Sequence, residues 1–314
     1  MQGGAMVQVT ARSVRLVDCA DFHLLSEYVC PSTITVASGT LSQLTLAVSG
    51  GEVLYLELDM QTKSFKITSS AQLDQDIACL SLRPVSGARE GAMEVEATGS
   101  AAATARSSSI LAVAMWTDNS VRLHALPTLE EICRVQLGTD VQARDILIVE
   151  LGDKVYLLIG LGDGRLITYT VDFSGDLPSL VNRRNGVLGT HPITFSCFQN
   201  AGAQCVFAAC DRPTVMYSKN GKVLFSVLDV SQTEFTNMAP FHSELFPYCL
   251  ALCSEASLVI GVIEDIQKVH IQTIPLGQAP SRIRHSAANG VYAGKSSRNI
   301  NLIYILDLIF FFFI

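Results

Sequence analysis

Three short apolar runs follow one another between Arg144 and Asp172, in the sequence RDILIVELGDKVYLLIGLGDGRLITYTVD. Each run is rich in β-branched or aromatic residues, and the pairs Gly152-Asp153 and Asp163-Gly164 separate them. Runs of this kind, divided by Gly- and Asp-containing pairs, are typical of strands joined by tight hairpin turns. The stretch therefore predicts three strands of an antiparallel meander.

The same pattern recurs along the chain. We took as a marker the apolar residue that opens the strand after the second turn. The markers are Val14, Val53, Val121, Leu166, Val215 and Leu258, so the spacings are 39, 68, 45, 49 and 43 residues. A period of about 40–45 residues with four strands in each repeat is typical of a β-propeller, and no long segment has a helical period. We predict an all-β fold, a β-propeller of repeated four-stranded antiparallel blades.

Two segments interrupt this periodicity. The long spacing contains the low-complexity segment 84–108, and without its 25 residues the spacing is 43. We expect this segment to be an inserted loop. Residues 286–299 are small and polar, whereas residues 300–314 are apolar with a single charge. A membrane helix needs about 20 apolar residues, so the last run is too short for one. We expect 286–314 to be an atypical, non-native tail from a mispredicted reading frame, and we expect no membrane contact.

The charge of the chain argues against a surface built for nucleic acid. The formal net charge is −7, and hydrophobic residues make up 49% of the sequence. A domain that covers phosphates needs an excess of lysine and arginine. The local basic pairs, Arg183-Arg184 and Lys219 with Lys222, each adjoin an Asn-Gly pair. We expect both pairs to lie at solvated turn tips.

The nine cysteines are odd in number, form no CxxC motif and mostly lie within apolar runs. This pattern is typical of reduced, buried thiols in a cytosolic or nuclear protein. Zinc would require paired ligands at short spacing together with a second pair. We therefore expect no metal and no cofactor.

No motif requires an enzyme. The sequence GLGDG at Gly160–Gly164 is followed by the strand-like run RLITYTV, whereas a nucleotide fingerprint must open a helix. The six histidines are scattered and none adjoins a plausible nucleophile. We expect no catalytic residues.

The only tryptophan lies in a predicted turn of the third repeat, Trp116-Thr117-Asp118-Asn119. A tryptophan at this position is explained structurally if its ring caps the blade. Tryptophan in a loop is also a frequent anchor of protein interfaces. Both interpretations stay open on the sequence alone.

Several stretches resemble the DNA damage-binding protein 1 family, the large triple-propeller adaptors of cullin-4 ubiquitin ligases. The most specific are AACDRPTVMYS at 208–218 and LVIGVIEDIQKVHIQTIPL at 258–276, and AMWTDNSVRLHALP and LGDGRLITY extend the similarity. The resemblance covers roughly 7–285 and excludes the insertion at 84–108. Related triple-propeller proteins are the large subunit of the cleavage and polyadenylation factor and a splicing-complex subunit.

The resemblance implies that residues 1–264 are an incomplete seven-bladed second propeller without its opening strands. Residues 265–285 would then cross into the third propeller. In this family the second propeller holds the amino-terminal region of cullin-4, and the other two propellers form the cleft for substrate receptors. The chain would therefore keep the cullin-binding module and lack the receptor cleft. Trp116, Thr117 and Asp118 match the family's turn, and we predict that they contact the cullin.

The expected function is that of a non-catalytic scaffold in a cullin-4 ligase that acts in the DNA-damage response and ubiquitin-dependent proteolysis. Its expected location is the nucleus, and also the cytoplasm, with nucleic acid contact indirect or weak. The alternative is a cleavage, polyadenylation or splicing subunit with nucleic acid binding. Binding to a cullin distinguishes the two, because only the ligase adaptor should show it.

Overall fold

The computed structural model describes 5–19, 21–59, 61–85, 108–175, 177–200, 202–219, 221–228, 235, 237–241, 249–254 and 257–262, and the backbone of 272–275, 280–286, 291–296 and 299–305. These residues contain strands and no helix, so the prediction of an all-β fold is confirmed for this part of the chain. The chain divides into two compact units, Ala5–Gly186 and Val187–Ile314.

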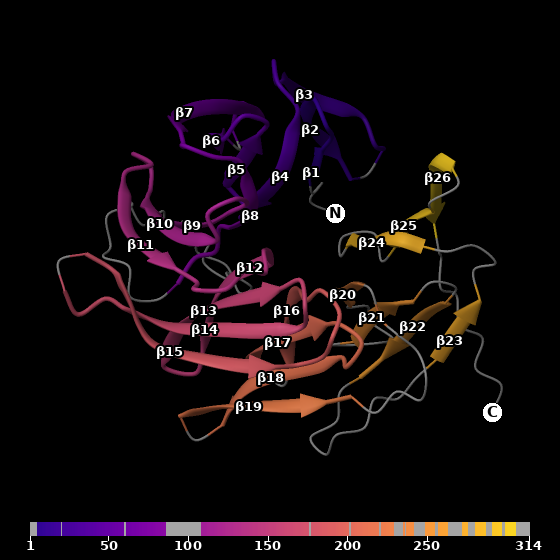
Figure 1. Ribbon diagram of the computed structural model, residues 1–314. Coiled ribbons are helices and arrows are strands. Elements are labelled where there is room, and N and C mark those ends of the chain that lie inside the picture. The colour runs from indigo at the N-terminus through magenta and orange to yellow at the C-terminus, as the bar shows by residue number, and fades with distance from the viewer. Residues whose placement is uncertain are drawn as a thin grey trace. The chain divides into compact units, whose positions relative to one another are not determined.

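The first unit contains four antiparallel sheets, one with three strands and three with four (Figure 1). The three-stranded sheet comprises β1 (Ala5–Val9), β2 (Ser13–Asp18) and β3 (Leu24–Val29). The second sheet comprises β4 (Ile34–Gly39), β5 (Gln43–Val48), β6 (Glu52–Asp59) and β7 (Ser64–Gln72). The third comprises β8 (Ile77–Ser81), β9 (Ile110–Met115), β10 (Ser120–Ala125) and β11 (Glu131–Gln136). The fourth comprises β12 (Ala143–Leu151), β13 (Lys154–Leu161), β14 (Arg165–Asp172) and β15 (Ser179–Val187).

The second unit contains two sheets of four strands and one of three. The first comprises β16 (Thr194–Asn200), β17 (Ala203–Ala209), β18 (Thr214–Lys219) and β19 (Lys222–Val227). The next comprises β20 (Asn237–Phe241), β21 (Cys249–Cys253), β22 (Ser257–Gly261) and β23 (Gln272–Pro275). The last comprises β24 (Pro280–Ser286), β25 (Val291–Ser296) and β26 (Asn299–Ile305).

Each sheet is a meander in which neighbouring strands in the sequence pair antiparallel, as in the blades of a propeller. The middle strands β5 and β9 are buried on both faces, because each packs between neighbouring sheets of the first unit. All six residues of β9, ILAVAM, are buried. The last strands β3, β7, β11, β15 and β19 are largely exposed or half-buried, as expected for strands with one face toward solvent. The core of the first unit thus lies between its sheets, as one cluster of β8–β10 with β12–β14 side chains illustrates.

The prediction that every blade has four strands is wrong for two sheets, β1-β2-β3 and β24-β25-β26. The second of these falls on residues that the sequence assigned partly to an atypical tail. The predicted domain boundaries remain a prediction. Most of the predicted insertion at 84–108 and the end of the tail lie outside the described residues.

One basic pair is placed differently from our expectation. Arg183 and Arg184 lie within β15 rather than at a turn tip, and the adjoining Asn185-Gly186 continues the strand. The Arg183 guanidinium donates a hydrogen bond to the carbonyl oxygen of Leu137 at 2.5 Å. That contact ties the outer strand to the link between the third and fourth sheets. Lys219 and Lys222, by contrast, are exposed where β18 and β19 meet, as predicted.

Candidate functional site

Trp116 lies where the third sheet leaves the core. Met115, the last residue of β9, is fully buried, whereas the Trp116 side chain is 40% exposed. The backbone N–H of Trp116 donates a 2.9 Å hydrogen bond to the carbonyl oxygen of Asp76, just before β8. The turn 116–119 is therefore fixed to the link that enters the same sheet. The prediction that these residues form a turn between two strands is confirmed.

An arginine of the next sheet accompanies the indole ring. The guanidinium carbon of Arg144, an exposed residue of β12, lies 5.8 Å from the centroid of the Trp116 ring. A guanidinium at this distance is attracted to the negative face of an indole, an interaction of about 0.5–1 kcal/mol at an exposed site. Arg144 therefore favours one orientation of a ring that is still 40% exposed.

Thr117 and Asp118 differ in their surroundings. Thr117 is exposed and faces solvent. The Asp118 carboxylate is directed toward its own sheet, where Oδ1 accepts hydrogen bonds from the Ser120 N–H at 2.9 Å and the Ser120 hydroxyl at 2.7 Å. Asp118 Oδ2 accepts hydrogen bonds from the guanidinium groups of Arg122 and Arg134. Asp118 thus shapes the turn, and Trp116 and Thr117 form its exposed surface.

The pKa of Asp118 reflects this environment. Partial burial acts to raise the pKa of the carboxyl group, because it disfavours the charged form. The hydrogen bonds from Ser120, Arg134 and Arg122 outweigh burial and leave the pKa below its usual value. Asp118 is therefore ionised at neutral pH, as its two arginine partners require.

The turn rests on a buried arginine that sequence analysis missed. The Arg122 side chain is only 4% exposed and forms ion pairs with three acidic side chains. The distances are 2.7 Å to Asp74 Oδ1, 3.3 Å to Asp118 Oδ2 and 3.6 Å to Glu131 Oε2. A buried charge is stable only when it is paired and hydrogen-bonded. The signal in the sequence was a cation within the otherwise apolar strand SVRLHAL.

The sequence GLGDG forms the hairpin turn that we predicted in place of a nucleotide site. Gly162 to Gly164 link β13 to β14, and Gly164 has a φ of 80°, a conformation that glycine adopts without strain. The Arg165 guanidinium pairs with Asp163 and donates a 3.1 Å hydrogen bond to the Thr139 hydroxyl. The loop is therefore an internally bonded turn.

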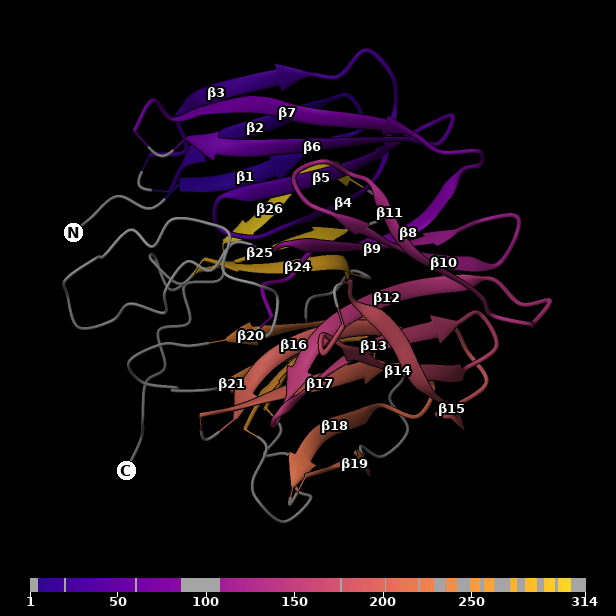
Figure 2. The same ribbon diagram turned by 90° about the vertical axis from the view of Figure 1, so that its left-hand side faces the viewer.

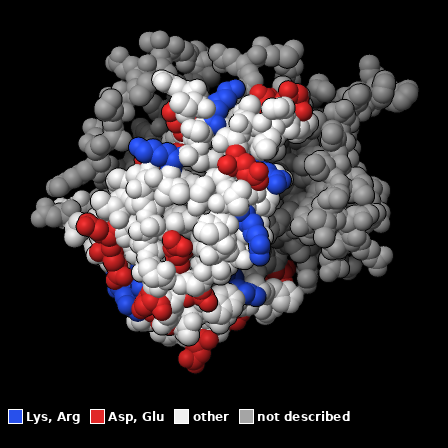
Figure 3. All heavy atoms as spheres, turned by 90° about the horizontal axis from the view of Figure 1, so that it is seen from above, with Lys and Arg blue, Asp and Glu red and all other residues white. Residues whose placement is uncertain are grey.

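Charged side chains of both signs are interspersed with uncharged ones on the face shown in Figure 3. No group of three or more histidine, cysteine or acidic side chains within the described residues is arranged to hold a metal ion. None of the nine cysteines forms a disulfide; Cys133 is half-buried, and the other eight are buried. In the part of the chain that the structure describes, no helix is long and apolar enough to cross a membrane.

Comparison with known families places the chain among propeller proteins. Residues 1–263 match the family model described as the RSE1/DDB1/CPSF1 second beta-propeller. A bacterial structure, a functionally unknown protein from Desulfotomaculum acetoxidans, has a TM-score of 0.67 and covers 94% of this chain and 89% of its own. At 10% sequence identity, that likeness shows the fold alone.

Several similar curated proteins are DNA damage-binding proteins. DNA damage-binding protein 1 of Oryza sativa subsp. japonica is 39% identical over 89% of this chain, and DNA damage-binding protein 1a of Arabidopsis thaliana is 40% identical over the same share. DNA damage-binding protein 1 of Solanum lycopersicum is 38% identical over 92% of the chain. The chain spans about a quarter of the length of these relatives, 24% of the first two. The RNA-processing alternative is not favoured by these matches. This chain belongs to the RSE1/DDB1/CPSF1 second β-propeller family, as a homologue of DNA damage-binding protein 1.

Proposed function

We propose that this chain is a non-catalytic protein-interaction scaffold, the adaptor module of a cullin-4 ubiquitin ligase that acts in the DNA-damage response. The similarity to DNA damage-binding protein 1 supports this function, since 38–40% identity extends over about 90% of the chain. The partner is the amino-terminal region of the cullin. We further propose that the sheets are blades of an incomplete seven-bladed propeller.

The observation that carries the proposal is the exposure of Trp116 on a rigid turn. A tryptophan contributes a large amphipathic surface at low entropic cost, and such residues dominate the binding energy of many interfaces. The hydrogen bond to Asp76 fixes its backbone, and the Arg144 guanidinium orients its ring. A partner helix or loop would therefore meet a preformed anchor and lose little affinity to ordering.

The residues around the anchor suggest the chemistry of the contact. Thr117 adds an exposed hydroxyl, and Arg144 adds a cation beside the ring. A partner with an apolar side chain next to an acidic group would complement this surface, because the acidic group pairs with Arg144 at the rim. Asp118 has the different role of holding the turn through Arg122 and Arg134.

The net charge of −7 is consistent with a scaffold that contacts nucleic acid weakly or through a partner. We place the protein in the nucleus and also in the cytoplasm, where the thiols of its buried cysteines stay reduced.

Titration of the purified full chain with a cullin-4 amino-terminal domain tests this function. A circular dichroism melt first establishes cooperative β structure. Saturable binding in isothermal calorimetry is the expected result. A cooperatively folded chain that shows no binding at any attainable concentration would contradict the adaptor function.

A further inference from the structure

Asn119 ends the Trp116 turn in a backbone conformation that few residues adopt. Its φ is 49°, in the left-handed region, which glycine, asparagine and aspartate tolerate better than other residues. Its side-chain oxygen Oδ1 is buried without a hydrogen-bond partner among the described residues. Strained residues and unsatisfied polar atoms persist where the surrounding structure compensates for them, often at functional sites. The other contacts of Asn119 therefore identify what compensates.

Two hydrogen bonds join Asn119 to the link between the third and fourth sheets, residues 137–142. The Leu137 N–H donates to the Asn119 carbonyl oxygen at 3.0 Å, which continues the pairing of β10 with β11. The Asn119 side chain donates from Nδ2 to the Thr139 carbonyl oxygen, also at 3.0 Å. The second bond requires the carboxamide, so the side chain of Asn119 extends the contact beyond the strand pairing.

The link is in turn fixed to the fourth sheet. The Thr139 hydroxyl accepts a 3.1 Å hydrogen bond from the guanidinium of Arg165 in β14. The Leu137 carbonyl oxygen accepts one from the guanidinium of Arg183 in β15. Figure 2 shows the third and fourth sheets side by side, with β8 to β11 next to β12 to β15. Asn119 therefore ties the Trp116 turn to the neighbouring sheet through a link that is itself held in place.

The cation beside the indole ring is positioned from the same sheet. Arg144 is the second residue of β12, directly after the link, and its guanidinium carbon lies 5.8 Å from the centroid of the Trp116 ring. The Gly162 N–H donates a 3.1 Å hydrogen bond to the Gln142 carbonyl oxygen at the end of the link. A Cβ atom added at Gly162 would lie 3.6 Å from Arg144 Cγ. The fourth sheet thus positions both the backbone of the turn and the cation over the ring.

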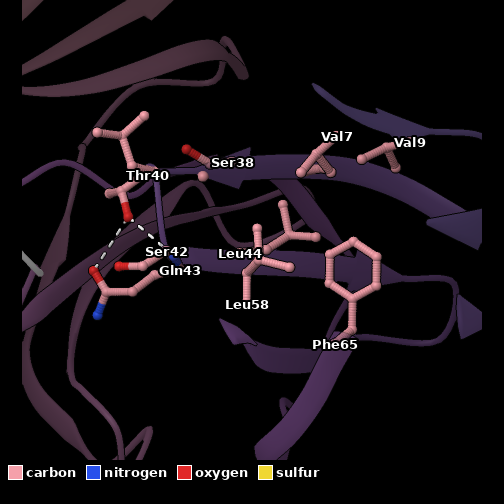
Figure 4. A pocket seen from close by; sticks show the side chains of 12 residues that line it. Val7, Val9, Ser38, Thr40, Ser42, Gln43, Leu44, Leu58 and Phe65 are labelled. Carbon is pink, nitrogen blue, oxygen red and sulfur yellow. Dashed lines mark hydrogen bonds between the residues drawn. The ribbon is translucent and has the colours of Figure 1, made fainter. Parts of the chain in front are cut away.

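Side chains within a turn can close it without help from another sheet. Between β4 and β5, the Thr40 hydroxyl accepts a 3.1 Å hydrogen bond from the Gln43 N–H and donates one to Gln43 Oε1 at 3.4 Å (Figure 4). Asp118 closes its own turn in an equivalent way, because Oδ1 accepts the Ser120 N–H at 2.9 Å. The carboxamide of Asn119 is therefore not needed to close the turn. Its bond to the link instead sets the position of the turn relative to the fourth sheet.

We propose that Asn119 is a positioning residue, which orders Trp116 for a binding partner by fastening its turn to the fourth sheet. This inference rests on the proposed function, in which Trp116 is the anchor of cullin binding. A ring that is already ordered loses less conformational freedom when a partner binds, so more of its contact surface contributes to affinity. Without the side-chain bond, the ring would sample more orientations, and Arg144 would lie over it for less of the time.

Fluorescence tests the proposal directly, because Trp116 is the only tryptophan of the chain. Asn119→Gly removes the carboxamide and retains a residue that adopts a positive φ without strain. Asn119→Asp keeps the shape of the side chain and replaces the Nδ2 donor with an acceptor. The matched control is Asn182→Gly on β15, because Asn182 also has a positive φ, 54°, but is exposed. Circular dichroism melts of the full chain verify that each variant folds.

Both Asn119 variants should increase the motion of the indole ring. The expected result is a larger fast component in the time-resolved fluorescence anisotropy and stronger quenching by acrylamide. Titration with a cullin-4 amino-terminal domain should show binding weakened by about threefold to tenfold, the cost of ordering one further side chain at an interface. Asn182→Gly should leave the fluorescence and the affinity unchanged.

Unchanged fluorescence in both Asn119 variants, or an equal change in Asn182→Gly, would overturn the proposal. Increased motion of the ring with unaltered cullin affinity would also overturn it, because Asn119 would then have a structural role alone. Absence of cullin binding by the unmodified chain would instead contradict the proposed function. The fluorescence measurements would still show whether Asn119 orders the ring, since they require no partner.

Discussion

The hydroxyl of Ser81 accepts a 2.9 Å hydrogen bond from the backbone N–H of Ile148, which joins β8 of the third sheet to β12 of the fourth. Ser38 and Leu82 make the equivalent bond between the second and third sheets. Side chains of consecutive sheets pack by apolar contact, which alone is not directional. These bonds fix the relative register of the first strands.

Ser81→Ala should therefore destabilise the protein by about 1–3 kcal/mol, since the buried Ile148 N–H loses its partner. Urea unfolding followed by circular dichroism measures the change. The control is Ser179→Ala at an exposed position of β15, which should change stability by less than about 0.5 kcal/mol. Equal effects of the two substitutions would show that the bond has no structural role.

Asp118→Asn should destabilise the first unit by about 1–3 kcal/mol at neutral pH, because charge-assisted hydrogen bonds to Arg122 and Arg134 are weakened. Asp163→Asn is the matched control, because it affects an exposed ion pair with Arg165 that is worth at most about 1 kcal/mol. Urea unfolding of both variants against the unmodified chain gives the comparison.

The lowered pKa of Asp118 predicts the pH dependence of that difference. Folding favours the charged form, so the contribution is complete above the ordinary pKa of about 3.9 and is lost as pH falls through the lower folded value. The stability of the unmodified chain and of Asp118→Asn should therefore converge in strong acid. A difference that stays constant from pH 7 to pH 2 would contradict this assignment.

His124 should make the protein less stable in mild acid. The residue is only 3% exposed, and burial lowers the pKa of its imidazole. A 2.9 Å hydrogen bond between Nδ1 and the Leu129 carbonyl and the nearby charge of Glu131 act in the opposite direction but do not outweigh burial. Nε2 is buried without a hydrogen-bond partner among the described residues. Protonation would place an N–H there with no acceptor.

The environment of His124 determines whether stability rises or falls with pH. The unfolded state binds the proton more readily, so stability contributed by neutral His124 is complete above the ordinary pKa of about 6.5 and declines below it. Thermal melts between pH 7.5 and 5.5 should show a fall in Tm that is reduced in His124→Gln. His23→Gln, at an exposed position, should retain the full fall. An unchanged Tm in the unmodified chain would refute the prediction.

Gly189→Ala should destabilise the second unit by about 1–3 kcal/mol through overpacking. A Cβ atom at Gly189 would overlap the carboxylate of Asp211. Asp211 accepts hydrogen bonds from the backbone N–H groups of Thr190 at 2.7 Å and His191 at 3.2 Å, so its displacement would release the link before β16. Gly186→Ala, where an added Cβ meets nothing within 4 Å, is the control. If neither substitution lowered the free energy of unfolding in denaturant melts, Asp211 would be able to move aside with no loss of stability, which would contradict the prediction.

Apolar patterning was sufficient to predict the buried strands. The three apolar runs between Arg144 and Asp172 were predicted as strands of a meander and form β12, β13 and β14, because periodicity and turn residues are local signals. β15 was missed, since its exposed sequence SLVNRRNGV is polar and contains an Asn-Gly pair typical of a turn. The sheet β24-β25-β26 was missed for a similar reason, because small polar residues dominate 286–299.

The sequence predicted only the exposed residues of the candidate site and not the buried partners that support them. Trp116 is notable in the sequence as the sole tryptophan, but its support comes from Asp76, 40 positions earlier, and from Arg144 in the next sheet. The ion pairs of Arg122 with Asp74 and Glu131 likewise join three separate strands or links. Pairings of this range depend on sheet packing, which one sequence does not specify.

The central claim is that Trp116 anchors a cullin. The most direct test compares the Kd of Trp116→Ala with that of Phe225→Ala for a cullin-4 amino-terminal domain, after melts verify that both variants fold. Phe225 is an aromatic residue at 50% exposure on β19, outside the proposed surface. We predict that Trp116→Ala weakens binding by at least about 30-fold, equivalent to a hot spot of about 2 kcal/mol, and that Phe225→Ala leaves it unchanged. Binding that survives the loss of Trp116 without change would contradict the account.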